Sequence, residues 1–159
     1  MKRLIVLCLG LLALVDASQS PIQQQAVDLL LDFFHSRNLV RSVFKEQAVT
    51  DVIEEVLNMG TFVQLQVELA QTHCRKQQRR THSCHIKAGG RRQTCLACIK
   101  FGSTDPESVL DRSLHCLSDQ SPVFQEVKRR HNQECENVKN AHEDRYLPGR
   151  FAFSKGQPS

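Results

Sequence analysis

Hydrophobic and polar residues follow a helical period at the start of the chain. Between Ser20 and Asn38 the apolar residues recur at the 3.6-residue spacing of a helix, at Ile22, Ala26, Leu29, Leu30, Phe33 and Phe34. Ser20 is a typical helix cap, Pro21 suits the first turn, and Gln23 stands where it can complete a capping box. This segment predicts a helix that begins at Ser20-Pro21 and ends near Arg37-Asn38.

The period changes to two residues further on. From Thr61 to Gln71, one face collects Val63, Leu65, Val67 and Leu69, and the other collects Gln64, Gln66, Glu68 and Ala70. This alternation predicts a half-buried antiparallel strand. The other strand candidates are Val40 to Val49, Gln93 to Phe101 and Ser113 to Leu117, with Asp51 to Asn58 compatible with a strand or a helix and turns at Gly60 and Gly102 to Pro106. One helix followed by several antiparallel strands predicts an α+β domain.

The two ends of the chain fall outside this pattern. Lys2-Arg3, the apolar run from Leu4 to Val15 and the small residue Ala17 have the layout of a secretory signal peptide. We therefore expect residues 1–17 to be removed and a soluble, extracellular chain from Ser18 to Ser159, since the apolar run is too short to span a bilayer. Residues 122–140 are polar with weak periodicity and receive no element, and residues 141–159 carry turn formers and read as a tail.

Cysteine usage fits export. Of seven cysteines, Cys8 lies in the leader, and six remain, an even number that predicts three disulfides outside the cell. Cys95 and Cys98, three positions apart on a predicted strand, point in different directions and should pair with partners elsewhere. Six cysteines permit fifteen pairings, and their spacing does not choose among them.

Reactive chemistry is not indicated by the motifs. His73, His82 and His85 lie near Cys74 and Cys84, but cysteines in disulfides cannot act as thiolate ligands, so we expect no metal there and no cofactor. Gly89-Gly90 is interpreted as a hairpin turn and not as a phosphate loop. With no nucleophile elbow or paired-carboxylate motif, we do not expect an enzyme.

Positive charge is concentrated in the middle of the chain. Residues 69–104 contain no acid and eight bases, of which Lys100 is the last. An exported protein meets sulfated polysaccharides and anionic membranes before nucleic acid, so this stretch predicts a polyanion-binding surface; the alternative is an ordinary solvated face. The residues assigned to the polyanion surface are Arg75, Lys76, Arg79, Arg80, Lys87, Arg91 and Arg92.

Three aromatic residues lie in the tail, at Tyr146, Phe151 and Phe153. The sequence Leu-Pro-Gly-Arg at 147–150 suits a type II turn, which would fold the aromatic residues on either side towards each other. Such a hook predicts a binding surface. The alternative is a latch that packs back on the domain.

The run from Cys95 to Gly102 (CLACIKFG), the six-cysteine spacing and the run from Tyr146 to Lys155 (YLPGRFAFSK) resemble the chemerin family. The resemblance implies a cystatin/cathelicidin-like fold, with one long N-terminal helix packed on a curved antiparallel β-sheet, three disulfides and a flexible C-terminal tail. It implies a signal peptide at 1–17, a cystatin-like domain at 18–140, a receptor-activating segment at 141–154 and a propeptide at 155–159. It also implies the disulfide pairs Cys74–Cys84, Cys95–Cys116 and Cys98–Cys135.

The same resemblance implies a secreted chemoattractant and adipokine precursor. Extracellular serine proteases would cut between Ser154 and Lys155, and the product would activate a chemokine-like G-protein-coupled receptor, recruit leukocytes and influence adipocyte differentiation and metabolism. The implied receptor-binding residues are Tyr146, Leu147, Pro148, Gly149, Arg150, Phe151, Ala152, Phe153 and Ser154.

Other functions rank lower. The alternative is a cationic host-defence protein whose basic residues bind heparin-like glycosaminoglycans or bacterial surfaces. Cysteine-protease inhibition ranks last, because the chain has neither a Gln-x-Val-x-Gly loop nor a Trp. We expect a monomer that binds no nucleic acid.

Two positions depart from the family pattern. Leu147 stands where Phe is usual and keeps an apolar anchor, so agonism should survive with changed potency. Arg150 stands where Gln is usual and offers trypsin-like proteases a second cut that would separate Phe151 to Ser154. We therefore expect a narrower choice of activating proteases.

Overall fold

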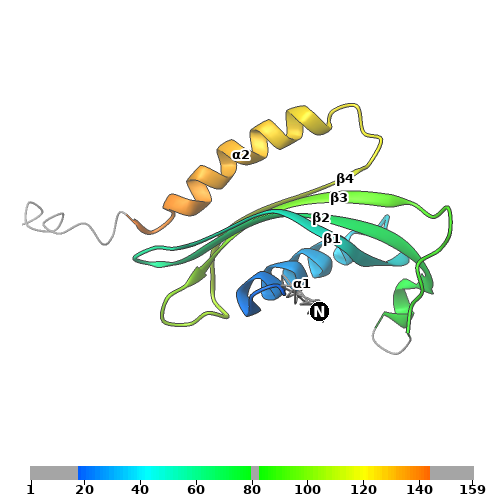
Figure 1. The fold of residues 1–159 in the computed structure, drawn as a ribbon, viewed down its shortest axis with the longest axis horizontal. Helices are drawn as coiled ribbons and strands as arrows, with labels where there is room; N and C mark the ends of the chain where they lie inside the picture. Colours follow the sequence, from blue (N-terminus) through cyan, green and yellow to red (C-terminus); the bar gives the residue numbers. More distant parts are fainter. Residues whose placement is uncertain (1–17, 80–82, 144–159) are drawn as a thin grey trace, which may run out of the picture.

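The computed structural model describes residues 18–79 and 83–143 as two helices on opposite faces of a four-stranded sheet (Figure 1). The sheet is antiparallel in the order β1-β2-β3-β4, so each strand lies beside its neighbour in sequence. The elements are α1 (Pro21–Ser36), β1 (Ser42–Val56), β2 (Gly60–Arg75), the short 3-10 helix η1 (Lys76–Gln78), β3 (Arg92–Gly102), β4 (Val109–Ser118) and α2 (Phe124–Asn140). The predicted α+β class is confirmed.

Helix α1 forms as its sequence predicts. Ser20 Oγ accepts a hydrogen bond from the Gln23 N–H, and Gln23 Oε1 accepts one from the Ser20 N–H, which completes the capping box. The helix buries Ala26, Val27, Leu30 and Phe34 against the sheet.

The strands that face α1 carry the main core. Val63, Leu65, Val67 and Leu69 of β2 are all buried there, as the alternation predicts. The weak candidate at 40–49 and the ambiguous segment at 51–58 form one strand, β1, with register shifts along its length. Gly60 begins β2, where a Cβ would overlap the carbonyl oxygen of Phe101.

The second helix, α2, was not predicted. It packs on the other face of the sheet and buries Val127, His131, Cys135 and Val138, which recur at helical spacing. Only two of these four are strongly apolar by type and His131 reads as polar, so the segment lacks an obvious hydrophobic stripe. Because both faces of β3 are covered, nearly all of that strand is buried.

The disulfide pairing implied by the resemblance is confirmed. Cys95–Cys116 joins β3 to β4, Cys98–Cys135 joins β3 to α2, and Cys74–Cys84 closes the segment after β2. Cys95 and Cys98 therefore have separate partners on opposite faces of the sheet.

The hairpin predicted at Gly89-Gly90 is wrong, although a turn exists there. Gly89 has φ +69°, and the Gly90 N–H donates to the Lys87 carbonyl over 3.0 Å. The segments on both sides of the turn pair with β2, through Ile86 with Thr72 and Arg92 with Ala70. The turn therefore interrupts a segment whose two sides both pair with β2.

Candidate functional site

A buried lysine joins the end of α2 to the sheet. Lys100 of β3 is 0% exposed, and its Nζ donates to the carbonyls of Lys139 and Ala141 over 2.7 and 2.6 Å and to Glu143 Oε1 over 2.8 Å. The Met59 N–H, from the β1–β2 turn, donates to the same carboxylate oxygen over 3.0 Å. We call this arrangement of Lys100, Glu143, Met59 and the two carbonyls the Lys100 clasp.

The clasp is electrostatically balanced. An ammonium at a helix C-terminus meets the negative end of the helix dipole and satisfies carbonyls that have no partner within the helix. Burial raises the pKa of the Glu143 carboxyl, but hydrogen bonds from Lys100 and the Met59 N–H outweigh it and leave this pKa below its ordinary value. Nearby, Lys139 Nζ pairs with Glu55 of β1 at 2.6 Å, a second link from the last turn of α2.

The clasp fixes the position of residues 141–143, the last that the structure describes. Residues 141–143 are held by Lys100, and Tyr146, the first predicted receptor-binding residue, follows three positions after Glu143. Residues 146–154, the cleavage position at Ser154 and Lys155, and the predicted signal peptide at 1–17 lie outside the described residues.

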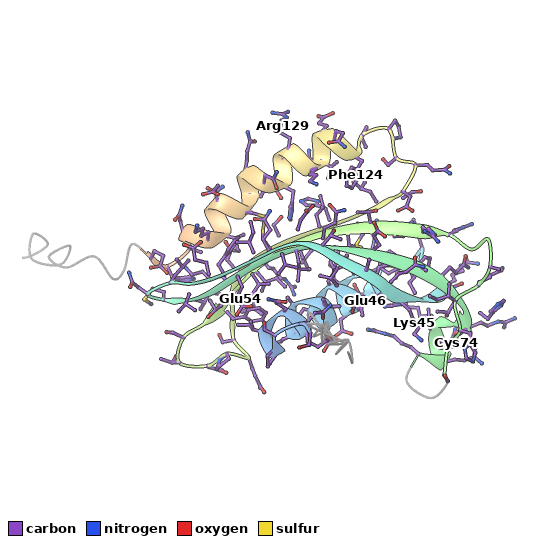
Figure 2. The ribbon with its side chains drawn as sticks, in the orientation of Figure 1. Lys45, Glu46, Glu54, Cys74, Phe124 and Arg129 are labelled. Atoms are coloured by element: carbon purple, nitrogen blue, oxygen red, sulfur yellow. A yellow bond between two sulfur atoms is a disulfide. The ribbon has the colours of Figure 1, made fainter. Side chains whose placement is uncertain are left out.

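The predicted polyanion surface lies at the opposite end of the sheet, around η1 (Figure 1). Figure 2 shows Lys45 and Cys74 at this end, where Lys45 Nζ donates to the Cys84 carbonyl over 3.0 Å. Arg75, Lys87, Arg91 and Arg92 are exposed there. Arg80 lies outside the described residues.

Two of the predicted cations have partners on or beside α1. Arg79 Nη1 lies 2.9 Å from Asp32 Oδ1, and Lys76 Nζ donates to the Arg37 carbonyl over 3.3 Å. These two residues help to fix the position of η1 against the helix. The exposed cations, Arg75, Lys87, Arg91 and Arg92, are therefore more accessible to a polyanion than these two.

The sequence analysis missed two further cations, Arg37 and Arg41. Both are exposed, and both line a groove of about 770 Å³ together with Lys87 and Arg91. Arg41 also borders a second groove of about 590 Å³ with Arg75 and Lys76. Arg37 and Arg41 lie outside the acid-free stretch, so the charge pattern along the sequence gave no signal for them.

We use the name basic end for the described cations around these grooves: Arg37, Arg41, Arg75, Lys76, Arg79, Lys87, Arg91 and Arg92. Lys100 belongs to the same acid-free stretch but not to this surface, since it is buried in the clasp.

A buried histidine links α1 to β1 beside the basic end. His35 Nδ1 lies 2.7 Å from the Leu31 carbonyl, and the Phe44 N–H donates to His35 Nε2 over 3.0 Å. The ring therefore donates at one nitrogen and accepts at the other, as only a neutral imidazole can. Burial, with smaller contributions from Arg79 and Lys76, lowers the pKa of His35.

A polar cluster lies between β4 and α2. Glu134 Oε2 accepts from Ser113 Oγ over 2.5 Å and lies 2.6 Å from His115 Nε2. Buried His131 lies behind them, with Nδ1 3.5 Å from Ser113 Oγ. Burial, followed by the nearby His115, lowers the pKa of His131 to about 4.

This cluster does not have the connectivity of a nucleophilic triad. In such a triad the carboxylate bonds one imidazole nitrogen and the hydroxyl bonds the other. Here Ser113 Oγ and Glu134 Oε2 both approach the same nitrogen, His115 Nε2, at 3.3 and 2.6 Å. Hydrogen bonds from His115 and then Ser113 lower the pKa of Glu134.

The fold defines the class of protein. Dimeric human cystatin F matches this structure with a TM-score of 0.52 at 20% identity, over 64% of this chain and 82% of that chain. The arrangement of α1 on one face of the antiparallel sheet is thus a cystatin-like fold, as the sequence resemblance implied. No family model matches the sequence.

Full-length relatives define the family more closely. Retinoic acid receptor responder protein 2 of Homo sapiens is 35% identical over 164 residues, covering 99% of both chains. The Bos taurus protein of the same name is 36% identical over 95% of this chain and 93% of its own, and the Mus musculus protein is 36% identical over 86% and 82%. The chain belongs to the retinoic acid receptor responder protein 2, or chemerin, family. Within the described residues, neither helix has the length and apolar character needed to cross a membrane.

Proposed function

We propose that this protein is a secreted precursor whose C-terminal segment, once trimmed, activates a chemokine-like G-protein-coupled receptor. Residues 146–154 are the agonist, and extracellular serine proteases remove residues 155–159 by cutting between Ser154 and Lys155. The product recruits leukocytes and acts as an adipokine in inflammation, adipocyte differentiation and metabolism. Family membership, the tail sequence and three disulfides suited to an oxidising compartment support this proposal.

The observation that carries the proposal is the Lys100 clasp. It holds residues 141–143 on the domain and so sets a fixed origin for the segment that follows. Cutting after Ser154 places a carboxylate directly behind Phe153 and removes the charge of Lys155. A receptor pocket that captures a terminal carboxylate beside aromatic side chains would reject the precursor.

The test is calcium mobilisation in cells that carry the chemokine-like receptor. We expect a response to a chain spanning Ser18 to Ser154 and none to a chain spanning Ser18 to Ser159. Phe153→Ala in the short chain should abolish the response, whereas Phe124→Ala, an aromatic change at the start of α2, should leave it intact. Equal responses to the long and short chains would contradict the precursor mechanism.

Arg150 provides a second test of activation. Plasmin should cut the precursor after both Arg150 and Lys155, which mass spectrometry of the released peptides would reveal. Cutting after Lys155 alone would contradict the restricted protease choice. Arg150→Gln should then raise the yield of active product if the second cut limits it.

A second function is favoured by the basic end, which we propose binds sulfated polysaccharides or bacterial surface polyanions. Exposed cations from the loop after α1, the end of β2 and the turn before β3 line two grooves. Several cations on one surface displace counterions from a polyanion, so binding should weaken as salt rises, by analogy with nucleic-acid backbones.

Heparin chromatography tests this second function with a matched control. Arg91→Ser with Arg92→Ser should elute at lower salt than the parent chain. Arg129→Ser with Arg130→Ser makes the same charge change on the outer surface of α2, where Figure 2 labels Arg129, and should elute later than the first variant. Identical elution of the two variants would show that net charge, and not the basic end, controls binding.

A further inference from the structure

The polar cluster between β4 and α2 has the composition of a cation site. Its three ligand-type side chains, His115, His131 and Glu134, offer two imidazole nitrogens and one carboxylate oxygen that all lie within 4.8 Å of one another. His131 and Glu134 are three residues apart on α2, which places them on the same side of the helix. His115 reaches them from β4 across the interface between strand and helix.

We propose that His115, His131 and Glu134 bind a zinc-type divalent cation between β4 and α2.

The present contacts already converge on one point. Ser113 Oγ lies 2.5 Å from Glu134 Oε2, 3.3 Å from His115 Nε2 and 3.5 Å from His131 Nδ1, so all three ligand atoms lie close to one hydroxyl, which must move aside to admit an ion. Ligands about 2.0–2.2 Å from a tetrahedral zinc ion lie about 3.4 Å from one another. The separation of 2.6 Å between His115 Nε2 and Glu134 Oε2 must therefore open by somewhat less than 1 Å as the ion replaces the hydrogen bond.

The surroundings suit a metal ligand at His131. The ring is 1% exposed, its Nε2 lies 3.2 Å from Cys135 Sγ, and its Nδ1 is directed at Ser113 Oγ, 3.5 Å away. A contact at the second ring nitrogen holds a ligating imidazole in a fixed orientation. His115 and Glu134 have side chains that are 28% and 37% exposed, so an ion can enter from solvent.

The donor set selects the type of ion. Two imidazoles and a carboxylate suit zinc and related transition metals, whereas calcium and magnesium prefer oxygen ligands alone. The Ser113 hydroxyl or a water molecule completes the tetrahedron. A neighbouring group, Cys98, His131 and Cys135, cannot serve as a thiolate site because its two sulfurs form a disulfide.

Isothermal titration calorimetry of the chain spanning Ser18 to Ser159 with Zn²⁺ tests the proposal. We expect one strong site per chain and no comparable heat from Mg²⁺. His115→Gln and Glu134→Gln should each weaken zinc binding at least about tenfold. His85→Gln changes an exposed histidine next to Cys84, outside the proposed site, and should leave the affinity unchanged.

A structural readout separates binding from folding. Circular dichroism should show that His115→Gln and Glu134→Gln retain the fold, since both residues are partly exposed. In the parent chain, zinc should shift the NMR signals of the ring nitrogens of His115 and His131 but not those of His85. No binding at concentrations up to about 1 mM, equal affinity in all variants, or loss of binding only in His85→Gln would overturn the proposal.

Discussion

The two ends of the sheet use positive charge in opposite ways. At the Lys100 clasp, one fully buried ammonium has three oxygen partners and joins β3 to the end of α2. At the basic end, Arg91 and Arg92 lie on the surface of the turn and the start of the same strand. Arg92 and Lys100 are eight residues apart, about 26 Å along a strand.

This difference shows that a charge run in a sequence does not define one surface. A strand carries neighbouring charges into different environments, and burial decides whether a charge stabilises the fold or remains available to a partner. We therefore expect changes at the clasp to alter stability and changes at the basic end to alter binding.

The largest effect should come from the disulfide that supports the clasp end. Replacing Cys98 and Cys135 by Ala frees α2 from β3 across a separation of 37 residues, and should lower the free energy of unfolding by about 4 kcal/mol. Replacing Cys74 and Cys84, whose separation is 10 residues, should cost about 3 kcal/mol. Urea unfolding measures both free energies. A larger loss of stability on replacing Cys74 and Cys84 than on replacing Cys98 and Cys135 would contradict this prediction.

Glu143→Gln should have the next largest effect. It leaves the buried Lys100 ammonium without its charged partner, which should lower the free energy of unfolding by about 3 kcal/mol. Glu136→Gln makes the same change at an exposed position of α2 and should cost less than about 0.5 kcal/mol. Denaturant unfolding that shows equal stability for the two variants would mean that the clasp contributes little.

The two ends should also respond to acid in different pH windows. His35 has a lowered pKa in the fold, so its contribution is complete above its ordinary value of 6.5 and is lost as the pH falls towards the folded pKa. Glu143 also has a lowered pKa, so its contribution is complete above 4.5 and is lost as the pH falls through the folded value.

Hydrogen exchange can separate these windows. The Phe44 amide, bonded to His35, should lose protection below pH 6.5, before the Met59 amide, bonded to Glu143, does so below 4.5. His35→Gln should flatten the first transition and leave the second unchanged. Loss of protection at both amides over the same pH range would indicate global unfolding and contradict the separation.

The smallest effect on stability should come from the basic end itself. Arg91→Ser with Arg92→Ser should change the free energy of unfolding by less than about 0.5 kcal/mol, because both side chains are exposed. Thermal unfolding measured beside the heparin experiment checks this. A large loss of stability would show that these cations support the fold.

The sequence predicts the elements whose burial follows residue type. The capping box and apolar stripe of α1 and the alternation in β2 both translate directly into buried faces. Helix α2 was not predicted because two of its four buried positions are His131 and Cys135, which do not form an apolar pattern. Its buried face can be recognised only when the disulfide and the polar cluster are known.

The site residues that the sequence could not predict depend on contacts distant in the chain. The sequence does not distinguish Lys100 from a surface base, because its partners, residues 139–143, lie far away along the chain. Arg37 and Arg41 come together with Lys87 and Arg91 only because the end of α1 and the turn at 87–90 line the same groove. The cluster of His115, His131 and Glu134 requires the packing of the unpredicted helix on β4.

The clasp has a mechanical consequence. A pull applied at Glu143 acts first on the bonds to Lys100 and Met59, and then on α2, which is tied covalently to β3 through Cys135. Tension therefore enters the sheet at β3, its most buried strand, and the hydrogen bonds of the clasp give way before any covalent bond does. Arg92 of the basic end begins the same strand, so when the basic end is held by a partner, tension applied at Glu143 runs along β3 between the two ends.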